Sequence, residues 1–269
     1  MIVLIKGAGD LATGIAYRLK KSGFDIVMTE INNPTTVRRT VAFSQAVFDN
    51  EIEIEGIKGI KVNNIDEIYI EISKGNIPII IDEKANIIKE LNPNVVVDAI
   101  IAKKNLGTSI NDAPIVIGVG PGFEAKKDCH LVVETKRGHY LGKVIEEGSA
   151  IPNTGIPGDI GGYTKERIIR ASSEGKIKPV ARIGDYVKKG DVVAYIDGVE
   201  VLAEIDGIIR GMLQDGIEVF KGMKSGDIDP RCEKNHCFTI SDKARSIGGG
   251  VLEGILYLSL IHISEPTRH

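Results

Sequence analysis

Apolar positions in the first half of the chain alternate between short continuous runs and a helical period. Residues 2–5, IVLI, form a continuous apolar run, which is typical of a strand buried on both faces. Apolar residues then recur at helical spacing from Leu11 to Leu19, and Gly23 follows where a helix commonly ends. Strands are further predicted at 25–31, 77–81, 94–101 and 114–120, a hairpin at 51–62, and helices at 40–48, 65–73 and 85–91. This alternation predicts an α/β domain with a doubly wound parallel sheet over residues 1–125.

The pattern changes after Gly122. Residues 126–170 combine strand-like alternation with a stretch rich in glycine and proline, and they are predicted to form a connecting region of strands and loops. Residues 171–232 hold short apolar strands separated by Gly-Asp and Asp-Gly turns. They resemble a biotinyl/lipoyl-type barrel-sandwich hybrid, but Asp197 and Gly198 stand at the hairpin tip where such carrier domains expose a lysine, so we expect a scaffold. Residues 233–257 return to helical spacing, and residues 258–269 are predicted to be a non-native tail.

Composition narrows the class of protein. The 269 residues are 42% hydrophobic and 26% charged, as in a globular protein long enough for two domains. A net charge of −3 gives no reason to expect nucleic acid or an anionic membrane as a partner. Three cysteines do not make a disulfide framework, and no apolar run approaches the ~18 residues of a membrane span. We therefore expect a cytoplasmic protein with neither membrane nor nucleic acid as a partner.

The stretch GAGDLATG at 7–14 joins the first predicted strand to the first predicted helix. Gly7, Gly9 and Ala12 match the G-x-G-x-x-G/A pattern of Rossmann-like domains, in which small residues permit a tight turn and let a pyrophosphate approach the helix N-terminus. We therefore predict a Rossmann-like domain that binds a nucleotide or a cofactor-like small molecule over the loop from Gly7 to Gly14.

Two carboxylates bear on this prediction. Glu30 ends the second predicted strand, about 20 residues after the turn, where an acid can accept a hydrogen bond from a ribose hydroxyl. Asp10 lies in the first turn of the helix, where its negative charge interacts favourably with the helix dipole. The same charge would repel a diphosphate placed directly over it. Both are predicted cofactor-site residues. Two interpretations stay open, a ligand-binding turn and a purely structural one.

Seven motifs resemble a known family. They are, in chain order, GAGDLATGIAYRL, MTEINNPTTVRRTVAF, DAIIAKKNLGT, IGVGPGFEA, VVETKRGHYLG, GSAIPNTGIPGDIGG and CFTISDKARSIGGGVLE. Together, from about Val3 to Leu256, they resemble the accessory proteins of selenium-dependent molybdenum hydroxylases. The resemblance implies a role in preparing or inserting the selenium-containing molybdenum cofactor. It also implies a molybdopterin nucleotide as a candidate ligand and a molybdenum hydroxylase as a partner, but no particular reaction.

Basic residues at several predicted strand ends suit an anionic ligand. Arg38 and Arg39 follow the second strand in PTTVRRTV, where two guanidinium groups could hold a phosphate, although a solvated charge pair is the alternative. Lys103 and Lys104 follow the strand at 94–101 in a loop that could face the same crevice, and Arg137 lies in a turn that could present a donor. The glycine turn GVGPGF at 118–123 fits either a ligand that approaches the backbone or simple loop punctuation.

The cysteines offer a separate candidate chemistry. Cys232, His236 and Cys237 lie close together in the sequence, but their spacing is not that of a zinc ribbon, so no metal site is predicted. An accessible cysteine of low pKa can carry sulfur or selenium, and Cys237 is the candidate catalytic residue for such a role. The alternative is a buried, inert Cys237. No role is assigned to Cys129 or Cys232.

Three hypotheses of function follow from these observations. The first is an accessory protein of selenium-dependent molybdenum hydroxylases that binds a nucleotide or a molybdopterin nucleotide. The second is an NAD(P)-dependent oxidoreductase in which Glu30 selects NAD over NADP. The third is a chaperone that holds the hydroxylase and performs no chemistry. The sequence assigns no enzymatic activity.

Overall fold

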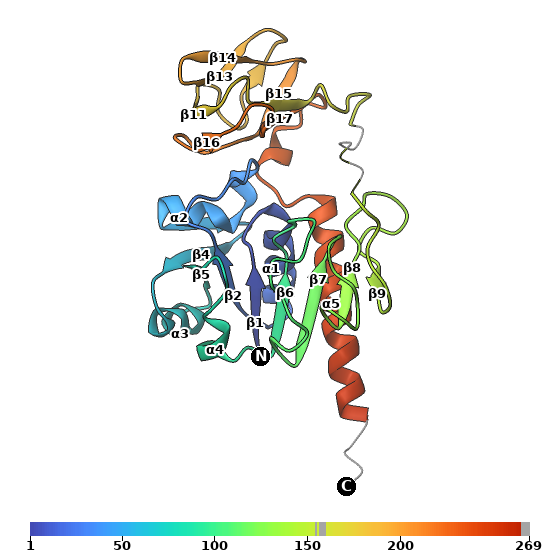
Figure 1. The fold of residues 1–269 in the computed structure, drawn as a ribbon. Helices are drawn as coiled ribbons and strands as arrows, with labels where there is room; N and C mark the ends of the chain where they lie inside the picture. The colour runs from blue at the N-terminus through green and yellow to red at the C-terminus, as the bar shows by residue number, and fades with distance from the viewer. Residues whose placement is uncertain (154, 156–159, 265–269) are drawn as a thin grey trace.

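The computed structural model describes residues 1–153, 155 and 160–264, with side chains described up to residue 260 in the last helix. An α/β domain lies beneath a smaller β-rich module (Figure 1). The chain builds most of the α/β domain first, then forms the module, and finally returns to the α/β domain in its last helix.

The α/β domain is built on one nine-stranded sheet, in the order β3-β4-β5-β2-β1-β6-β7-β8-β9. The strands from β4 to β8 in this order run parallel to one another. At the two edges β3 and β9 pair antiparallel with their neighbours. The strands are β1 (Ile2–Lys6), β2 (Asp25–Glu30), β3 (Glu51–Ile54), β4 (Ile57–Val62), β5 (Ile77–Ile81), β6 (Val95–Asp98), β7 (Ile115–Val119), β8 (Leu131–Val133) and β9 (Val144–Ile145).

Helices cover both faces of this sheet. One face packs against α1 (Asp10–Lys21) and α5 (Asp242–Ser264), and the other against α3 (Ile65–Ser73) and α4 (Ile88–Leu91). Successive residues of β1 accordingly belong to different cores, because side chains alternate across a strand: Ile5 packs on the side of α1 and α5, and Leu4 on the side of α3. Burial on both faces explains why the strands are continuously apolar.

Helices α1 and α5 approach each other through small residues. A Cβ added at Gly14 would lie 2.6 Å from the Cβ of Ala244, and one added at Gly248 would lie 2.7 Å from the carbonyl oxygen of Gly14. Ile247 and Val251 of α5 are fully buried in the core that α1 shares. The last helix therefore completes the core that the first helix begins.

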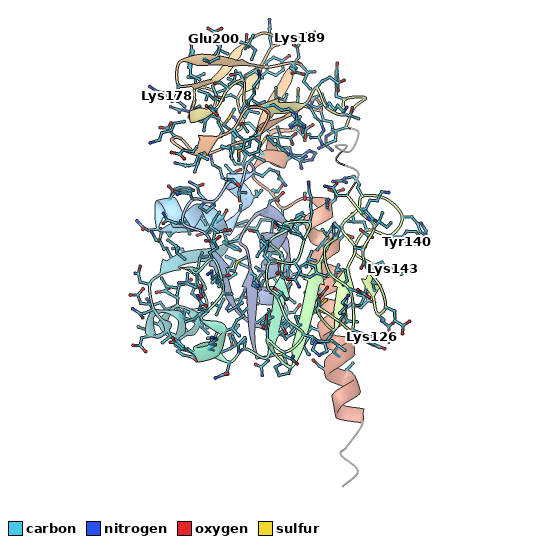
Figure 2. The ribbon with its side chains drawn as sticks, in the orientation of Figure 1. Lys126, Tyr140, Lys143, Lys178, Lys189 and Glu200 are labelled. Atoms are coloured by element: carbon cyan, nitrogen blue, oxygen red, sulfur yellow. The ribbon has the colours of Figure 1, made fainter. Side chains whose placement is uncertain are left out.

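The module consists of two four-stranded antiparallel sheets, in the orders β10-β17-β15-β12 and β14-β13-β11-β16. Its own apolar core lies between them and includes the fully buried Val193, Ile209 and Met212. Lys178 and Lys189 lie on its outer side, away from the α/β domain (Figure 2). The strands are β10 (Ile168–Arg170), β11 (Gly175–Pro179), β12 (Tyr186–Val187), β13 (Val192–Ile196), β14 (Val199–Leu202), β15 (Gly207–Met212), β16 (Glu218–Val219) and β17 (Lys224–Asp229).

The segment after β2 docks the module onto the α/β domain. It contains two 3-10 turns and one short helix, η1 (Arg39–Val41), η2 (Phe43–Gln45) and α2 (Ala46–Asp49). The amide of Met212 in β15 donates to the carbonyl of Val37 at 2.7 Å, and the Nε of Arg39 donates to the carbonyl of Met212 at 3.1 Å. On the return path, η3 (Lys234–Cys237) is held where the hydroxyl of Thr40 donates to the carbonyl of Cys237 at 2.6 Å.

Several predicted elements are confirmed. The strand at 77–81 and the helix at 65–73 coincide with β5 and α3, and the hairpin at 51–62 is formed by β3 and β4. The helix predicted at 40–48 is wrong, because this stretch breaks into η1, η2 and α2, and its Thr40 and Gln45 side chains bond to Cys237 and Gln214. The helix predicted at 85–91 shrinks to α4 at its final turn.

The predicted fold class requires correction. The sheet is neither wholly parallel nor complete by residue 125, because antiparallel strands close both edges and β8 and β9 extend it to Ile145. The β-rich part is a pair of separate four-stranded antiparallel sheets. The molecule is therefore an α/β protein with a large mixed sheet and additional antiparallel sheets, and the prediction of a Rossmann-like parallel sheet with a biotinyl/lipoyl-like sandwich hybrid is wrong.

The carboxyl-terminal prediction concerns residues 258–269. Helix α5 continues through residues 258–264, and residues 265–269 lie outside the described part of the chain. In the part that is described, no helix is at once long enough and apolar enough to cross a membrane. The domain boundaries and the cytoplasmic location stay predictions.

Candidate functional site

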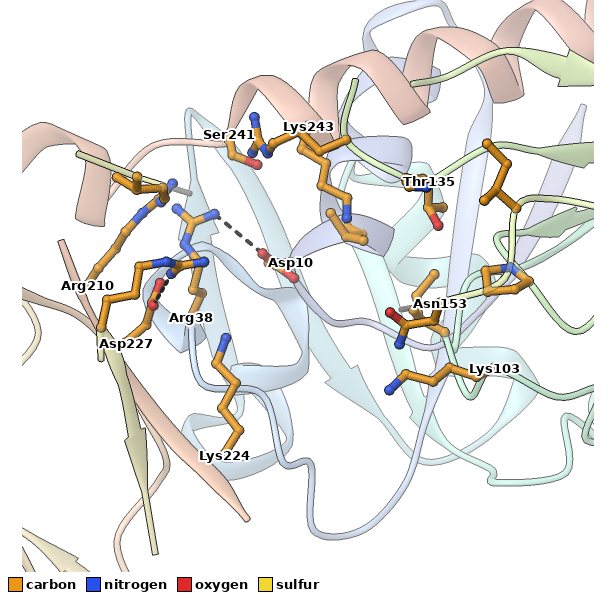
Figure 3. Close-up of a pocket in the computed structure, with 18 of the residues that line it drawn as sticks. Asp10, Arg38, Lys103, Thr135, Asn153, Arg210, Lys224, Asp227, Ser241 and Lys243 are labelled. Carbon is orange, nitrogen blue, oxygen red and sulfur yellow. Dashed lines mark hydrogen bonds and ion pairs between the residues drawn. The ribbon is translucent and has the colours of Figure 1, made fainter. Parts of the chain in front are cut away.

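A cavity of about 600 Å³ opens between the α/β domain and the module (Figure 3). Strand β17 and the buried strand β15 supply one wall, and loops that follow β6 and β8 supply the opposite wall. The first turns of α1 and α5 also reach it, through Asp10, Ser241 and Lys243. Helix N-termini favour anions, since their first amide groups have no partner within the helix.

Positive charge dominates the lining of this cavity. Eight of the described lining residues are basic and two are acidic, namely Arg38, Lys103, Lys136, Arg137, Arg167, Arg210, Lys224 and Lys243 against Asp10 and Asp227. The whole chain, by contrast, has a net charge of −3. The cavity is therefore positively charged although the chain as a whole carries a net negative charge.

Arg38 is buried at the centre of the contact between the two parts, with 7% of its surface exposed. Its Nη2 donates to the carbonyl oxygens of His236 and Thr239 at 3.0 and 3.1 Å, and its Nη1 lies 3.4 Å from a carboxylate oxygen of Asp10. Its Nε is buried and has no hydrogen-bond partner. Arg38 thus holds the return segment in place while one donor remains unused.

Arg210 is a second buried guanidinium, carried by β15 and 8% exposed. Its Nη1 lies 3.7 Å from Asp229, and its Nε is buried without a hydrogen-bond partner. Burial, and then the nearby Arg38, lower the pKa of Arg210 below its ordinary value. Two positive charges held this close in a partly dry site favour an anion between them.

Several lysines add charge that the protein does not neutralise. Lys103, Lys136, Lys224 and Lys243 line the cavity, and none of the four has an ion pair among the described residues. Burial, and then the charge of Arg137, lower the pKa of Lys243. Figure 3 shows the ammonium group of Lys243 directed into the cavity. These groups are available to a ligand.

A buried carboxylate shapes the loops of the α/β wall. One oxygen of Glu134 accepts from the amides of Thr135 and Lys136, both at 2.7 Å, and the other accepts from the amide of Ile151 at 2.8 Å. Glu134 is 2% exposed, so it brings two cavity-lining loops together without lining the cavity itself. It is a positioning residue.

Arg137 and Asp242 fix the start of α5 beside the cavity. The guanidinium of Arg137 donates to both oxygens of Asp242, at 2.6 and 3.2 Å. This hydrogen bonding lowers the pKa of the Asp242 carboxyl to about 2. Behind it, the hydroxyl of Ser241 accepts from the amide of Ala244 at 3.2 Å, as an N-cap does.

The predicted glycine loop forms the expected tight turn. Gly7 has φ +89° and Gly9 precedes α1 as its N-cap, while Ala12 is fully buried against the sheet. A Cβ at Gly7 would lie 3.1 Å from the backbone of Ile100, so the turn packs on the segment that follows β6. Gly14 serves the contact with α5 described above. Contact of these four residues with a ligand stays a prediction.

Glu30 differs from its predicted arrangement. Its carboxylate accepts from the loop amide of Ala8 at 2.9 Å and from the amide of Ile31 at 2.8 Å. Burial raises its pKa above the ordinary value, while these two hydrogen bonds act in the opposite direction. Glu30 therefore closes the glycine loop on itself, because its carboxylate occupies the amide of Ala8. It does not line the cavity.

The remaining predicted site residues do not all lie at the cavity. Asp10 and Arg38 line the cavity, whereas Arg39 lies outside it and bonds to the module. Cys237 is fully buried, and its thiol lies 3.6 Å from the carbonyl of Ile209. Burial raises the pKa of this thiol, although Arg210 and Arg38 oppose the shift. Such a setting disfavours a nucleophilic thiolate, and the chalcogen-carrying role stays a prediction.

The close approach predicted for GVGPGF is made by the protein itself. A Cβ at Gly122 would lie 2.6 Å from the backbone nitrogen of Lys104, so this turn packs on the loop that carries Lys103. Among the residues the structure describes, no group of three or more His, Cys, Asp or Glu could hold a metal ion.

Sequence reasoning missed the module's share of the site. The sequence patterns single out none of Arg167, Arg210, Lys224 and Lys243, although all four line the cavity. The signal that could have found Arg210 is its place in GIIRGM, where one arginine interrupts an otherwise apolar run that is buried throughout. A buried arginine requires a partner, and that partner can be a ligand.

No protein-family model matches the chain. The chain is 49% identical, over 257 residues, to a protein of Escherichia coli (strain K12) described as uncharacterized protein YqeB. The match covers 96% of this chain and 48% of that protein, so the chain spans about half the length of the curated relative it matches.

Solved structures give only distant likenesses. One is a succinylglutamate desuccinylase from Silicibacter sp. TM1040, with 11% identity, 84% of each chain covered and a TM-score of 0.26. Another is an aspartoacylase family protein from Mesorhizobium loti, with 12% identity, 84% of this chain and 83% of that chain covered, and a TM-score of 0.25. Likeness at this level carries no argument about activity.

The comparisons overturn the predicted family. Nothing in them points to the accessory proteins of selenium-dependent molybdenum hydroxylases, since the curated relative is described as uncharacterized and the solved structures as desuccinylase and aspartoacylase proteins. The predicted role in maturation of the selenium-containing molybdenum cofactor is therefore wrong. The hydroxylase partner and the alternatives of an NAD(P)-dependent oxidoreductase and a hydroxylase chaperone gain no support.

Proposed function

We propose that the protein binds an anionic small molecule in the cavity between the α/β domain and the module. The observation that carries this proposal is the pair of buried arginines that line the cavity, Arg38 and Arg210, within a lining that holds more basic than acidic residues. The charge of Arg38 disfavours the charged form of Arg210, and an oxyanion bound between the two guanidinium groups would offset that repulsion through charge-assisted hydrogen bonds.

The size of the cavity favours a small molecule over a macromolecule. Its volume of about 600 Å³ lies within the range of ~300–1,000 Å³ typical of small-ligand pockets. Apolar side chains of Leu11, Ile101 and Ile151 contribute to the lining beside the basic groups. The ligand we expect is thus an organic anion, bound through its charge and covered on part of its surface by aliphatic groups.

Isothermal titration calorimetry with inorganic pyrophosphate tests the proposal. We expect saturable binding to the intact chain that weakens as ionic strength rises, because salt screens charge. Arg210→Met should lower the affinity at least about tenfold, since a hydrogen bond to a charged group contributes roughly 1.5–3 kcal/mol and each ~1.4 kcal/mol is tenfold.

The matched control is Arg182→Met, an exposed arginine of the module that does not line the cavity. It should bind pyrophosphate like the unmodified chain. Circular dichroism of both variants shows whether they are folded. Equal affinities of the two folded variants for pyrophosphate would contradict the proposal, as would a failure of both pyrophosphate and longer organic bisphosphonates to bind the unmodified chain.

A further inference from the structure

The positive charge in the cavity is divided between two poles. The module pole consists of Arg38, Arg210 and Lys224, and the sheet pole consists of Lys103 and Lys243 (Figure 3). Figure 3 shows the poles on opposite sides of the cavity, with the carboxylate of Asp10 between them. Arg210 and Lys224 belong to the module, Arg38 to the segment on which the module docks, and Lys103 to a loop of the α/β domain.

Asp10 separates the poles electrostatically. Its carboxylate lies 3.4 Å from the Nη1 of Arg38, and its negative charge also acts on Lys243, whose pKa it raises against the effect of burial. A single compact anion at the centre would therefore meet a like charge, which costs free energy in a partly buried site. Anionic groups placed at the two poles avoid this repulsion.

Two neutral hydrogen-bonding groups accompany the sheet pole. Thr135 and Asn153 line the cavity on the same side as Lys103 in Figure 3, and both carry side-chain groups that can donate to an oxyanion. The module pole instead offers the guanidinium groups of Arg38 and Arg210, both of which line the cavity. Each pole is thus equipped to hold an anionic group of its own.

We propose that the ligand carries two separated anionic groups, one bound at the module pole and the other at the sheet pole, with its body bridging Asp10. This inference rests on the proposed function, since it describes the class of molecule that the same cavity binds. It excludes a single phosphate, and a compact diphosphate, as the preferred ligand.

Calorimetry with alkane-α,ω-bisphosphonates of one to eight methylene groups tests the inference, with methylphosphonate for comparison. Methylenebisphosphonate, with one methylene group, matches the longer compounds in its number of phosphonate groups but cannot separate them. We expect affinity to pass through a maximum at a longer spacer, which should bind at least tenfold more tightly than both methylenebisphosphonate and methylphosphonate.

Substitutions at each pole locate the two groups. Arg210→Met and Lys103→Met should each weaken the optimal bisphosphonate at least tenfold, whereas methylphosphonate should lose affinity in only one of the two variants. Lys104→Met is the matched control for Lys103, because it changes the adjacent exposed lysine, which does not line the cavity. It should leave every affinity unchanged.

The outcomes separate the two proposals. If methylenebisphosphonate binds as tightly as every longer compound, or if Lys103→Met has no effect, the cavity holds anions at one pole only; the two-pole inference then fails while the proposed function stands. If no compound in the series and no pyrophosphate binds the unmodified chain, both proposals fail.

Discussion

A carboxylate at the sequence position of Glu30 can play either of two structural roles. An acid at the end of the second strand can reach a ribose, but it can equally reach the amides of the turn beside it. Here it accepts from Ala8 and Ile31, at 2.9 and 2.8 Å. The sequence contains no information that separates these roles, because both place a carboxylate next to the same loop.

The three cysteines allow a direct test of burial at single residues. Cys232 is exposed, whereas Cys129 and Cys237 are buried, and burial raises the pKa of Cys129 to about 11. Only the thiolate reacts rapidly. At pH 8 we expect 5,5′-dithiobis-(2-nitrobenzoate) to modify one thiol rapidly in the folded protein and all three in denaturant.

Variants assign the rapid reaction. Cys232→Ser should remove the rapid phase, and Cys237→Ser should retain it. A rapid phase that disappears in Cys237→Ser instead would show that Cys237 is accessible. That result would favour the chalcogen-carrying role predicted from the sequence.

Among the elements, the contact between α1 and α5 depends on glycines that a helix would otherwise disfavour. Gly14→Ala should destabilise the protein by about 1–3 kcal/mol, although alanine is the better helix former, because its Cβ would lie 2.6 Å from that of Ala244. Urea unfolding followed by circular dichroism measures the change.

Gly249→Ala provides the matched control in α5. No atom lies within 4 Å of a Cβ added there, so the higher helix propensity of alanine should increase the free energy of unfolding by up to about 1 kcal/mol. Equal effects at Gly14 and Gly249 would contradict the close helix contact.

Local sequence predicted elements well where burial alone determines them. The strand at 77–81 is a continuous apolar run because both faces of β5 are covered, and nothing outside the run is needed to specify it. The stretch at 40–48 shows the opposite case. Its apolar spacing suits a helix, but Arg39 and Thr40 bond to residues far along the chain, at Met212 and Cys237, and these bonds select tight turns instead.

For the whole molecule, the cavity depends on contacts that a sequence pattern cannot specify. Arg38, Lys103 and Arg210 are far apart in the chain, and Arg210 lines the same cavity as the other two only because the module docks on the segment after β2. Single strand ends, such as the one before Lys103, could be predicted to face a ligand because strand ends meet at one edge of a sheet. The opposite wall could not, since its place depends on the docking.

Docking of the module can be tested through Arg39, whose Nε donates to the carbonyl of Met212 at 3.1 Å. Arg39→Met removes this bond without changing the cavity lining. We expect amide hydrogen exchange to accelerate in β15 and in η3 while the exchange of β1 and β6 stays slow, because local opening exposes only the contacts that were weakened.

Arg182→Met again serves as the control and should leave exchange unchanged. Exchange that accelerates throughout the α/β domain in Arg39→Met would contradict a local docking role. Mass spectrometry of peptides from the folded, full chain provides the measurement.

The path of the chain also has a consequence for biosynthesis. The core beneath α1 is completed by Ile247 and Val251 of α5, which the ribosome adds only after the entire module. A nascent chain that has emerged as far as β9 therefore exposes an apolar face of its sheet to the cell until the module has been translated. The first part to be made is among the last to become stable, and this interval is when the newborn polypeptide most needs protection from aggregation.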